Sequence, residues 1–197
     1  MLKTTLIRLT LFAVLSAPAC AEDVTIPIRA EQMIVTWTLG AALHTVHGQF
    51  EVQNGLLRFD PESKSVSGDM KVDLTTGGSG NAKRDAKMRN DVLETAKYPL
   101  AVFTAHFIAG HLNASGTSHV VLSGTLFIHG ARHDLTLPLD VVTRDGRVES
   151  GETRLSVPYV AWGMQNPSVF LLRVSERVDV DVRMIAQPPT QPSSHNY

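Results

Sequence analysis

Apolar and polar residues alternate one by one along much of this chain. In the most regular row, Met70, Val72 and Leu74 are separated by Lys71 and Asp73. Because successive side chains of a strand point to opposite faces, this pattern indicates strands with one face buried and the other in water. The same alternation recurs at 101–107, 135–141 and 178–184.

Pairs of turn-forming residues separate these rows. Asn54-Gly55 and Asp145-Gly146 are typical of tight hairpin turns, because Asn, Asp and Gly tolerate the backbone conformations that such turns need. We therefore predict eight strands and a further candidate at 147–157. The eight strands are expected at 33–39, 44–53, 56–60, 65–74, 100–109, 118–129, 132–144 and 168–185.

One segment departs from the alternation and predicts a helix over 80–97. Within it, Met88 and Val92 recur at helical spacing. Asn81 can cap the start of this helix, and Pro99 follows its end. A single helix among many strands is the expected arrangement.

These elements predict an all-β protein with one helix, in which eight antiparallel strands close into a β-barrel. Closure is favoured because it removes exposed strand edges. The interior of an eight-stranded barrel can be filled by side chains or can hold one slender ligand, and the pattern leaves both alternatives open. An unfilled interior lined by these apolar rows would favour hydrocarbon. The candidate wall residues are Trp37, Val72, Phe103, Phe107 and Leu137.

The N-terminus has the pattern of a secretory signal peptide, with early positive charge, an apolar centre at 9–15 and small residues at 16–21. Cleavage before Glu22 would release the protein into the periplasm or the medium. The alternatives are a lipoprotein cut that leaves an acylated Cys20, and a buried N-terminal helix. The predicted organisation is a signal peptide over 1–21, a barrel domain over 22–186 and a disordered tail over 187–197.

Composition narrows the choice of partners. The formal net charge is −1, and no basic cluster of the kind that binds nucleic acid is present. Cys20 is the only cysteine, so the expected domain has no disulfide. No second apolar stretch of the sequence is long enough to cross a bilayer as a helix.

The eight histidines do not follow a metal-binding pattern. His44 and His47 are three residues apart, which places them on opposite faces of a strand. His129 and His133 flank a turn and supply two ligands at most, fewer than a zinc site needs. The sequence also lacks a G-x-S-x-G nucleophile motif. We therefore expect no metal, no cofactor and no catalytic centre.

Two roles are open for Arg84, which precedes Asp85 at the start of the predicted helix. Its guanidinium could meet an anionic head group at the barrel mouth, because it suits phosphate geometry. Alternatively, the pair could tie the helix to the barrel through hydrogen bonds. Met88 and Leu93 likewise fit either helix packing or a gate for a lipid.

Three blocks of sequence resemble the YceI-like family. Residues between 43 and 60 look like its opening hairpins. The block 81–103, with its Arg-Asp pair and its Tyr-Pro before a strand, resembles its central signature. Residues 124–130 match a G-x-L-x-I-x-G hairpin. The resemblance covers about residues 30–184.

This resemblance implies an extended, lipocalin-like barrel outside the cytoplasm, with an apolar tunnel for a long isoprenoid chain and no catalytic centre. The leading hypothesis is thus an exported lipid carrier, with Arg84 and the wall residues as binding candidates. A transient membrane contact and a dimer are both compatible with it. The alternatives are a filled, structural or stress-protective barrel that acts through protein partners, and a small-molecule hydrolase or isomerase. The segment 157–168 departs from the family pattern and leaves the ligand's identity open.

Overall fold

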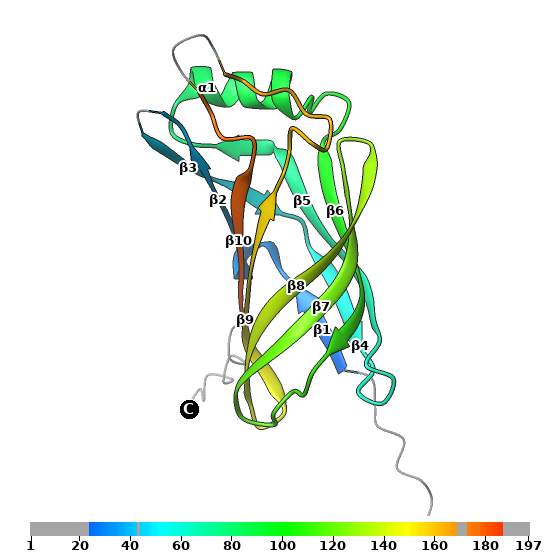
Figure 1. Cartoon of the computed structure of the whole chain (residues 1–197). Coiled ribbons are helices and arrows are strands. Elements are labelled where there is room, and N and C mark those ends of the chain that lie inside the picture. The colour runs from blue at the N-terminus through cyan, green and yellow to red at the C-terminus, as the bar shows by residue number, and fades with distance from the viewer. Residues whose placement is uncertain (1–23, 43, 169–172, 187–197) are drawn as a thin grey trace, which may run out of the picture.

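The computed structural model describes residues 24–42, 44–168 and 173–186. In this part of the chain, ten strands form the wall of one barrel, and one helical segment lies across its end (Figure 1). The predicted signal peptide at 1–21 and tail at 187–197 fall outside the described residues. The strands are β1 (Val24–Ile28), β2 (Met33–Gly40), β3 (Thr45–Val52), β4 (Gly55–Phe59), β5 (Val66–Gly78), β6 (Leu100–Ala109), β7 (Gly116–Ile128), β8 (Ala131–Arg144), β9 (Arg147–Val157) and β10 (Val178–Ile185). The helical elements are η1 (Ala30–Gln32), α1 (Ala82–Lys87) and η2 (Met88–Val92).

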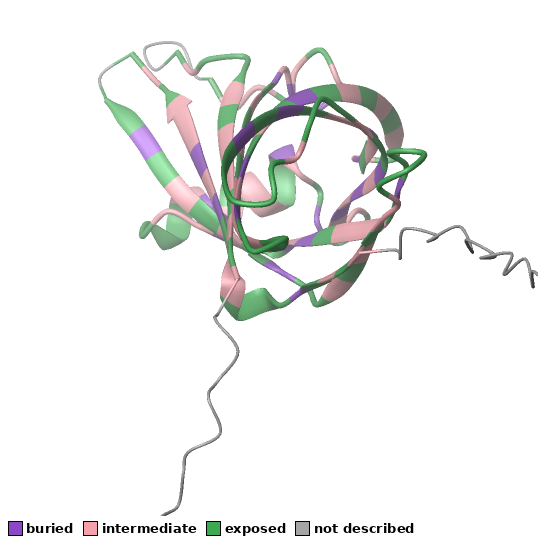
Figure 2. Ribbon diagram, turned by 90° about the horizontal axis from the view of Figure 1, so that it is seen from below, coloured by how far each residue is buried: buried purple, intermediate pink, exposed green. Residues whose placement is uncertain are grey.

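Eight of the strands close into a ring, in the order β5-β3-β2-β10-β9-β8-β7-β6 and back to β5. All the pairings are antiparallel. The ring closes because β5 pairs with β3 through one edge and with β6 through the other. Seen along the barrel axis, the ribbon forms a closed circle (Figure 2). The predicted fold class, an eight-stranded antiparallel barrel with one helix, is confirmed.

The two remaining strands extend the wall at one end. β4 pairs with the first residues of β5, as β3 pairs with its later residues. β1 pairs in turn with β4, as β2 pairs with β3. β1 and β2 are therefore two segments of one interrupted strand, and so are β3 and β4. The part of the barrel wall that they form is longer than the pattern of alternation predicted.

Several elements differ from the expectations. β1 was not predicted, and the candidate at 147–157 is a full strand, β9. The last strand begins at Val178 rather than at 168. Of the described residues before it, Val174 forms only an isolated bridge with Ala41. The helix ends at Val92, where η2 turns with a wider π-helical bond from the Leu93 N–H to the Met88 carbonyl, 2.9 Å.

Apolar side chains fill the barrel unevenly. One cluster, the packed cluster, consists of Val66, Phe103, Ala105 and Leu137. A second set of buried residues lies nearer to α1 and includes Leu74, Val92 and Met164. Residues of this second set border a cavity whose lining includes none of the packed cluster. Among the described residues, no helix is long and apolar enough to cross a membrane.

Candidate functional site

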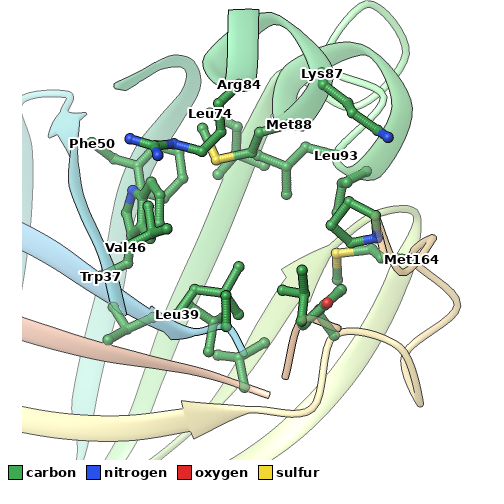
Figure 3. Close-up of a pocket in the computed structure, with 18 of the residues that line it drawn as sticks. Trp37, Leu39, Val46, Phe50, Leu74, Arg84, Lys87, Met88, Leu93 and Met164 are labelled. Carbon is green, nitrogen blue, oxygen red and sulfur yellow. The ribbon is translucent and has the colours of Figure 1, made fainter. Parts of the chain in front are cut away.

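A cavity of about 490 Å³ lies inside the barrel, beneath α1 and η2 (Figure 3). This volume is within the range typical of small-molecule sites, roughly 300–1,000 Å³. Aliphatic, aromatic and thioether side chains make up most of its wall. They are Trp37, Leu39, Ala41, Val46, Phe50, Leu74, Met88, Val92, Leu93, Ile128, Val157, Tyr159, Met164, Pro167, Val174, Val178 and Val180.

The interior stays open because two large aromatic side chains lie back against glycines. Trp37 of β2 stands opposite Gly48 of β3 in the sheet register. A Cβ at Gly48 would overlap the Trp37 ring, so the indole packs directly on this backbone. A Cβ at Gly77 would similarly stand 2.5 Å from Phe50. Without side chains at these glycines, the rings cover the wall and leave the centre free.

The roof of the cavity is the helical segment α1–η2. Met88 and Leu93 extend from it toward the interior (Figure 3). Asn81 caps the helix, because its side-chain oxygen accepts a hydrogen bond from the Arg84 N–H at 3.1 Å. The Arg89 side chain donates to the Gly77 carbonyl at 2.7 Å and so ties the roof to the end of β5.

Asp85 and Arg84 anchor the start of this roof. The Asp85 carboxylate accepts hydrogen bonds from the Ser79 backbone N–H, at 3.0 Å, and from the Ser79 hydroxyl. Arg84 donates from Nε to the same hydroxyl, at 2.8 Å, and from Nη2 to the Ser79 carbonyl, at 3.1 Å. Burial acts to raise the pKa of Asp85, but these hydrogen bonds and the Arg84 charge outweigh it and hold the pKa below its usual value.

The segment between β9 and β10 forms one side of the cavity. Its Tyr159 hydroxyl donates to the Ser175 carbonyl at 2.7 Å, and Met164 is buried against the interior. Trp162 of the same segment stacks on His133 of β8, with ring centroids 3.9 Å apart. Burial lowers the pKa of His133, whose Nε2 has no hydrogen-bond partner within the described structure. The neutral imidazole therefore suits this position.

A family model described as the YceI-like domain matches residues 20–186. The chain belongs to this family. Its barrel is also similar to two solved structures. One is BcnA of Burkholderia cenocepacia, at 17% identity and a TM-score of 0.63, covering 81% of this chain and 99% of that one. The other is a polyisoprenoid binding domain from Saccharophagus degradans, at 17% identity and a TM-score of 0.61, covering 81% and 98%.

A third similar structure is a YceI protein of Campylobacter jejuni, at 18% identity and a TM-score of 0.54, covering 74% of this chain and 88% of that one. Comparison with curated protein sequences gives no match. At these levels of identity, the similar structures establish the fold of this YceI-like chain, and its site must be argued from its own residues.

The candidate site residues predicted from sequence do not gather in one place. Trp37 and Arg84 both line the cavity. Val72 is buried close by but does not reach the cavity surface. Phe103 and Leu137 belong to the packed cluster and are not among the residues that line the cavity.

Phe107 requires a correction, because its side chain is 41% exposed and does not face the interior. The cause is a bulge in β6. Ala105 pairs with Gly124 and Phe107 with Ser123, so one extra residue, His106, is inserted between them. A one-residue insertion moves every later side chain to the opposite face. Ile108 consequently packs inward in place of Phe107.

Several cavity residues were absent from the predicted set. Leu39 and Phe50 lie on strands that the pattern did predict, and Leu39 follows Trp37 by two residues, so parity could have identified it. Met88 and Leu93 were weighed only as alternatives between packing and a gate. The Tyr159 and Met164 wall has no regular pattern, and no sequence signal would have placed it at the cavity.

The histidines considered as metal ligands have other surroundings. His44 borders the cavity, Nε2 of His129 lies 2.7 Å from Oε2 of Glu94, and His133 stacks on Trp162. His47 bonds the Thr38 hydroxyl at 3.1 Å. In the described ranges, no three His, Cys, Asp or Glu side chains are grouped as metal ligands would be.

Proposed function

We propose that this YceI-like protein binds a long apolar molecule of the isoprenoid type in its cavity and carries it outside the cytoplasm. The cavity beneath α1 is the observation that carries the proposal. A hydrocarbon chain that leaves water for such a site gains about 0.8 kcal/mol per CH₂. Ten buried carbons would therefore contribute roughly 8 kcal/mol before the costs of association.

The chemistry of the wall supports a chain rather than a compact polar metabolite. Branched aliphatic side chains, the Phe50 and Trp37 rings and the Met88 and Met164 thioethers surround the space. Methionine adapts its shape to irregular hydrocarbon, as a methyl-branched chain would require. A structurally similar domain from Saccharophagus degradans is described as polyisoprenoid binding.

A carrier role is favoured over catalysis by the composition of the same wall. The lining includes His44 and Tyr159, which can act as acids or bases, but no Ser, Thr, Cys, Asp or Glu to act with them. Nucleophilic catalysis by an activated hydroxyl or thiol would need such a partner close to a bound molecule. The Tyr159 hydroxyl already donates to a backbone carbonyl, and burial together with Glu176 raises its pKa.

The export part of the proposal rests on the signal-peptide pattern of the N-terminus. The mass of the protein recovered from the periplasm or medium tests it. A mature chain that starts at Glu22 is the expected result, whereas an acylated Cys20 would indicate an anchored lipoprotein instead. Retention of the full-length chain in the cytoplasm would contradict export.

Native mass spectrometry of the purified protein tests the binding proposal. We expect a stoichiometric adduct that organic solvent releases as an isoprenoid-type lipid. Val180→Phe should reduce the adduct because it adds a ring inside the cavity. The matched control is Val121→Phe, since Val121 is exposed on β7. Bare protein that also fails to take up added polyprenyl lipids would refute the proposal.

A further inference from the structure

Three basic side chains of α1 border the cavity. Lys83, Arg84 and Lys87 all contribute to its lining. In Figure 3, Arg84 extends toward the side of Phe50, and Lys87 extends away from it, so that the cations stand apart along the roof. Positive charge therefore lines the boundary between the apolar interior and water, on a chain whose formal net charge is −1.

The charges of the two lysines are not compensated locally. Arg84 lies beside Asp85 and shares its Ser79 partner. Lys83 and Lys87, by contrast, are exposed and take part in none of the ion pairs between described residues. No acidic side chain belongs to the described lining of the cavity. The mouth thus has a local excess of positive charge.

The hydrogen-bonding groups of the lining are also mostly donors. Trp37 is 4% exposed, and its indole N–H has no acceptor among the described residues. The helix cap occupies the Asn81 side-chain oxygen and leaves its amide group to donate, whereas Tyr159 gives its proton to the Ser175 carbonyl. The Trp37 nitrogen has almost no accessible surface, so the donors within reach of a ligand are those of the roof.

We propose that this cavity selects amphiphiles with an anionic head group, a phosphate or a carboxylate, whose apolar chain enters the barrel. The chain occupies the space lined by residues such as Leu39 and Val180, and the head group lies at the roof within reach of Lys83 and Lys87. This inference rests on the proposed function and adds the chemical class of the ligand's polar end. Hydrogen bonds between cations and oxyanions are stronger than neutral ones, so they would discriminate against uncharged lipids of equal chain length.

The experiment compares ligands that share a chain and differ in charge. Geranylgeranyl phosphate is paired with geranylgeraniol, and palmitate with hexadecanol. Each displaces the neutral probe N-phenyl-1-naphthylamine from the full mature protein, below the concentration at which the amphiphiles aggregate. We expect each anion to bind about tenfold more tightly than its alcohol, which corresponds to about 1.4 kcal/mol, with a smaller ratio at high salt.

The variant Lys83→Gln/Lys87→Gln should remove most of this preference and leave the affinity for the alcohols unchanged. Lys71→Gln is the matched control, because Lys71 is exposed on β5 and does not line the cavity. Tighter binding of geranylgeranyl phosphate than of palmitate would identify an isoprenoid phosphate as the source of the anion. Tighter binding of palmitate would identify a fatty acid instead.

Two results would overturn the inference while leaving the carrier function in place. One is equal binding of anions and alcohols to the unmodified protein. The other is an anion preference that persists in the double variant. Failure of all four ligands and of the probe to bind would instead refute the proposed function itself.

Discussion

Replacement of one leucine in each half of the barrel tests the contrast between its filled and open parts. Leu137 is 8% exposed and belongs to the packed cluster, whereas Leu39 faces the cavity on one side. Leu137→Ala removes packed methyl groups and leaves a void, which costs about 3 kcal/mol of unfolding free energy. That loss corresponds to a fall in Tm of roughly 6–12 °C for a domain of this size.

Leu39→Ala should cost about 1 kcal/mol of unfolding free energy, because the side of Leu39 that faces the cavity makes no contacts with protein atoms that the substitution could remove. Urea unfolding of the delipidated protein, followed by circular dichroism, measures both changes. Ligand affinity should show the opposite order, with a loss for Leu39→Ala and little change for Leu137→Ala. Equal stability losses for the two variants would refute the reasoning, since they would mean that protein side chains occupy the cavity.

Three further changes probe the wall, the roof and the side of the cavity. Gly48→Ala should cost about 1–3 kcal/mol in urea unfolding and weaken ligand binding, because the added methyl displaces the Trp37 ring. Asp85→Asn should cost about 1–3 kcal/mol at pH 7. Since the pKa of Asp85 is lowered in the folded protein, its contribution is present above about pH 4 and lost on further acidification, and urea unfolding of the variant should lack this acid-sensitive part. His133→Phe keeps a ring on Trp162 and should make stability less dependent on pH between about 7 and 5, as measured by unfolding at both values.

The sign of the His133 effect follows from its surroundings. Burial lowers the pKa of the folded imidazole, so the unfolded chain binds a proton more readily as the pH falls. Stability from the neutral ring is therefore present above about pH 6.5 and declines below it. An identical pH dependence in His133→Phe would contradict this explanation. Unchanged unfolding free energy of Gly48→Ala would contradict the packing of Trp37 on Gly48. Full acid sensitivity of Asp85→Asn would contradict the contribution assigned to the Asp85 carboxylate.

The barrel itself could be predicted because local alternation reports burial directly. The row from Met70 to Leu74 and the row from Val178 to Met184 each became a strand, since side-chain direction has a period of two along a strand. The helix was recognisable for a similar reason, as Asn81 does cap its start. These features depend on neighbours in sequence.

The site could be predicted only in part. Trp37 and Arg84 line the cavity, whereas the bulge after Ala105 turned Phe107 outward. An inserted residue leaves no trace in a short apolar row, because Phe107 and Ile108 fit either face equally well. The sequence also gave no means to decide whether an inward residue meets another side chain or empty space.

By itself, the sequence determined the period of each element, the antiparallel barrel and the apolar character of its interior. The tertiary structure decided where that interior is filled. Phe103 and Trp37 are both aromatic residues on inward-facing rows, and each ring lies against a glycine, Gly124 and Gly48. Phe103 nevertheless packs into a cluster, whereas Trp37 borders the cavity. The difference arises from the side chains and the roof that surround each ring. Both are set by contacts between segments far apart in the chain.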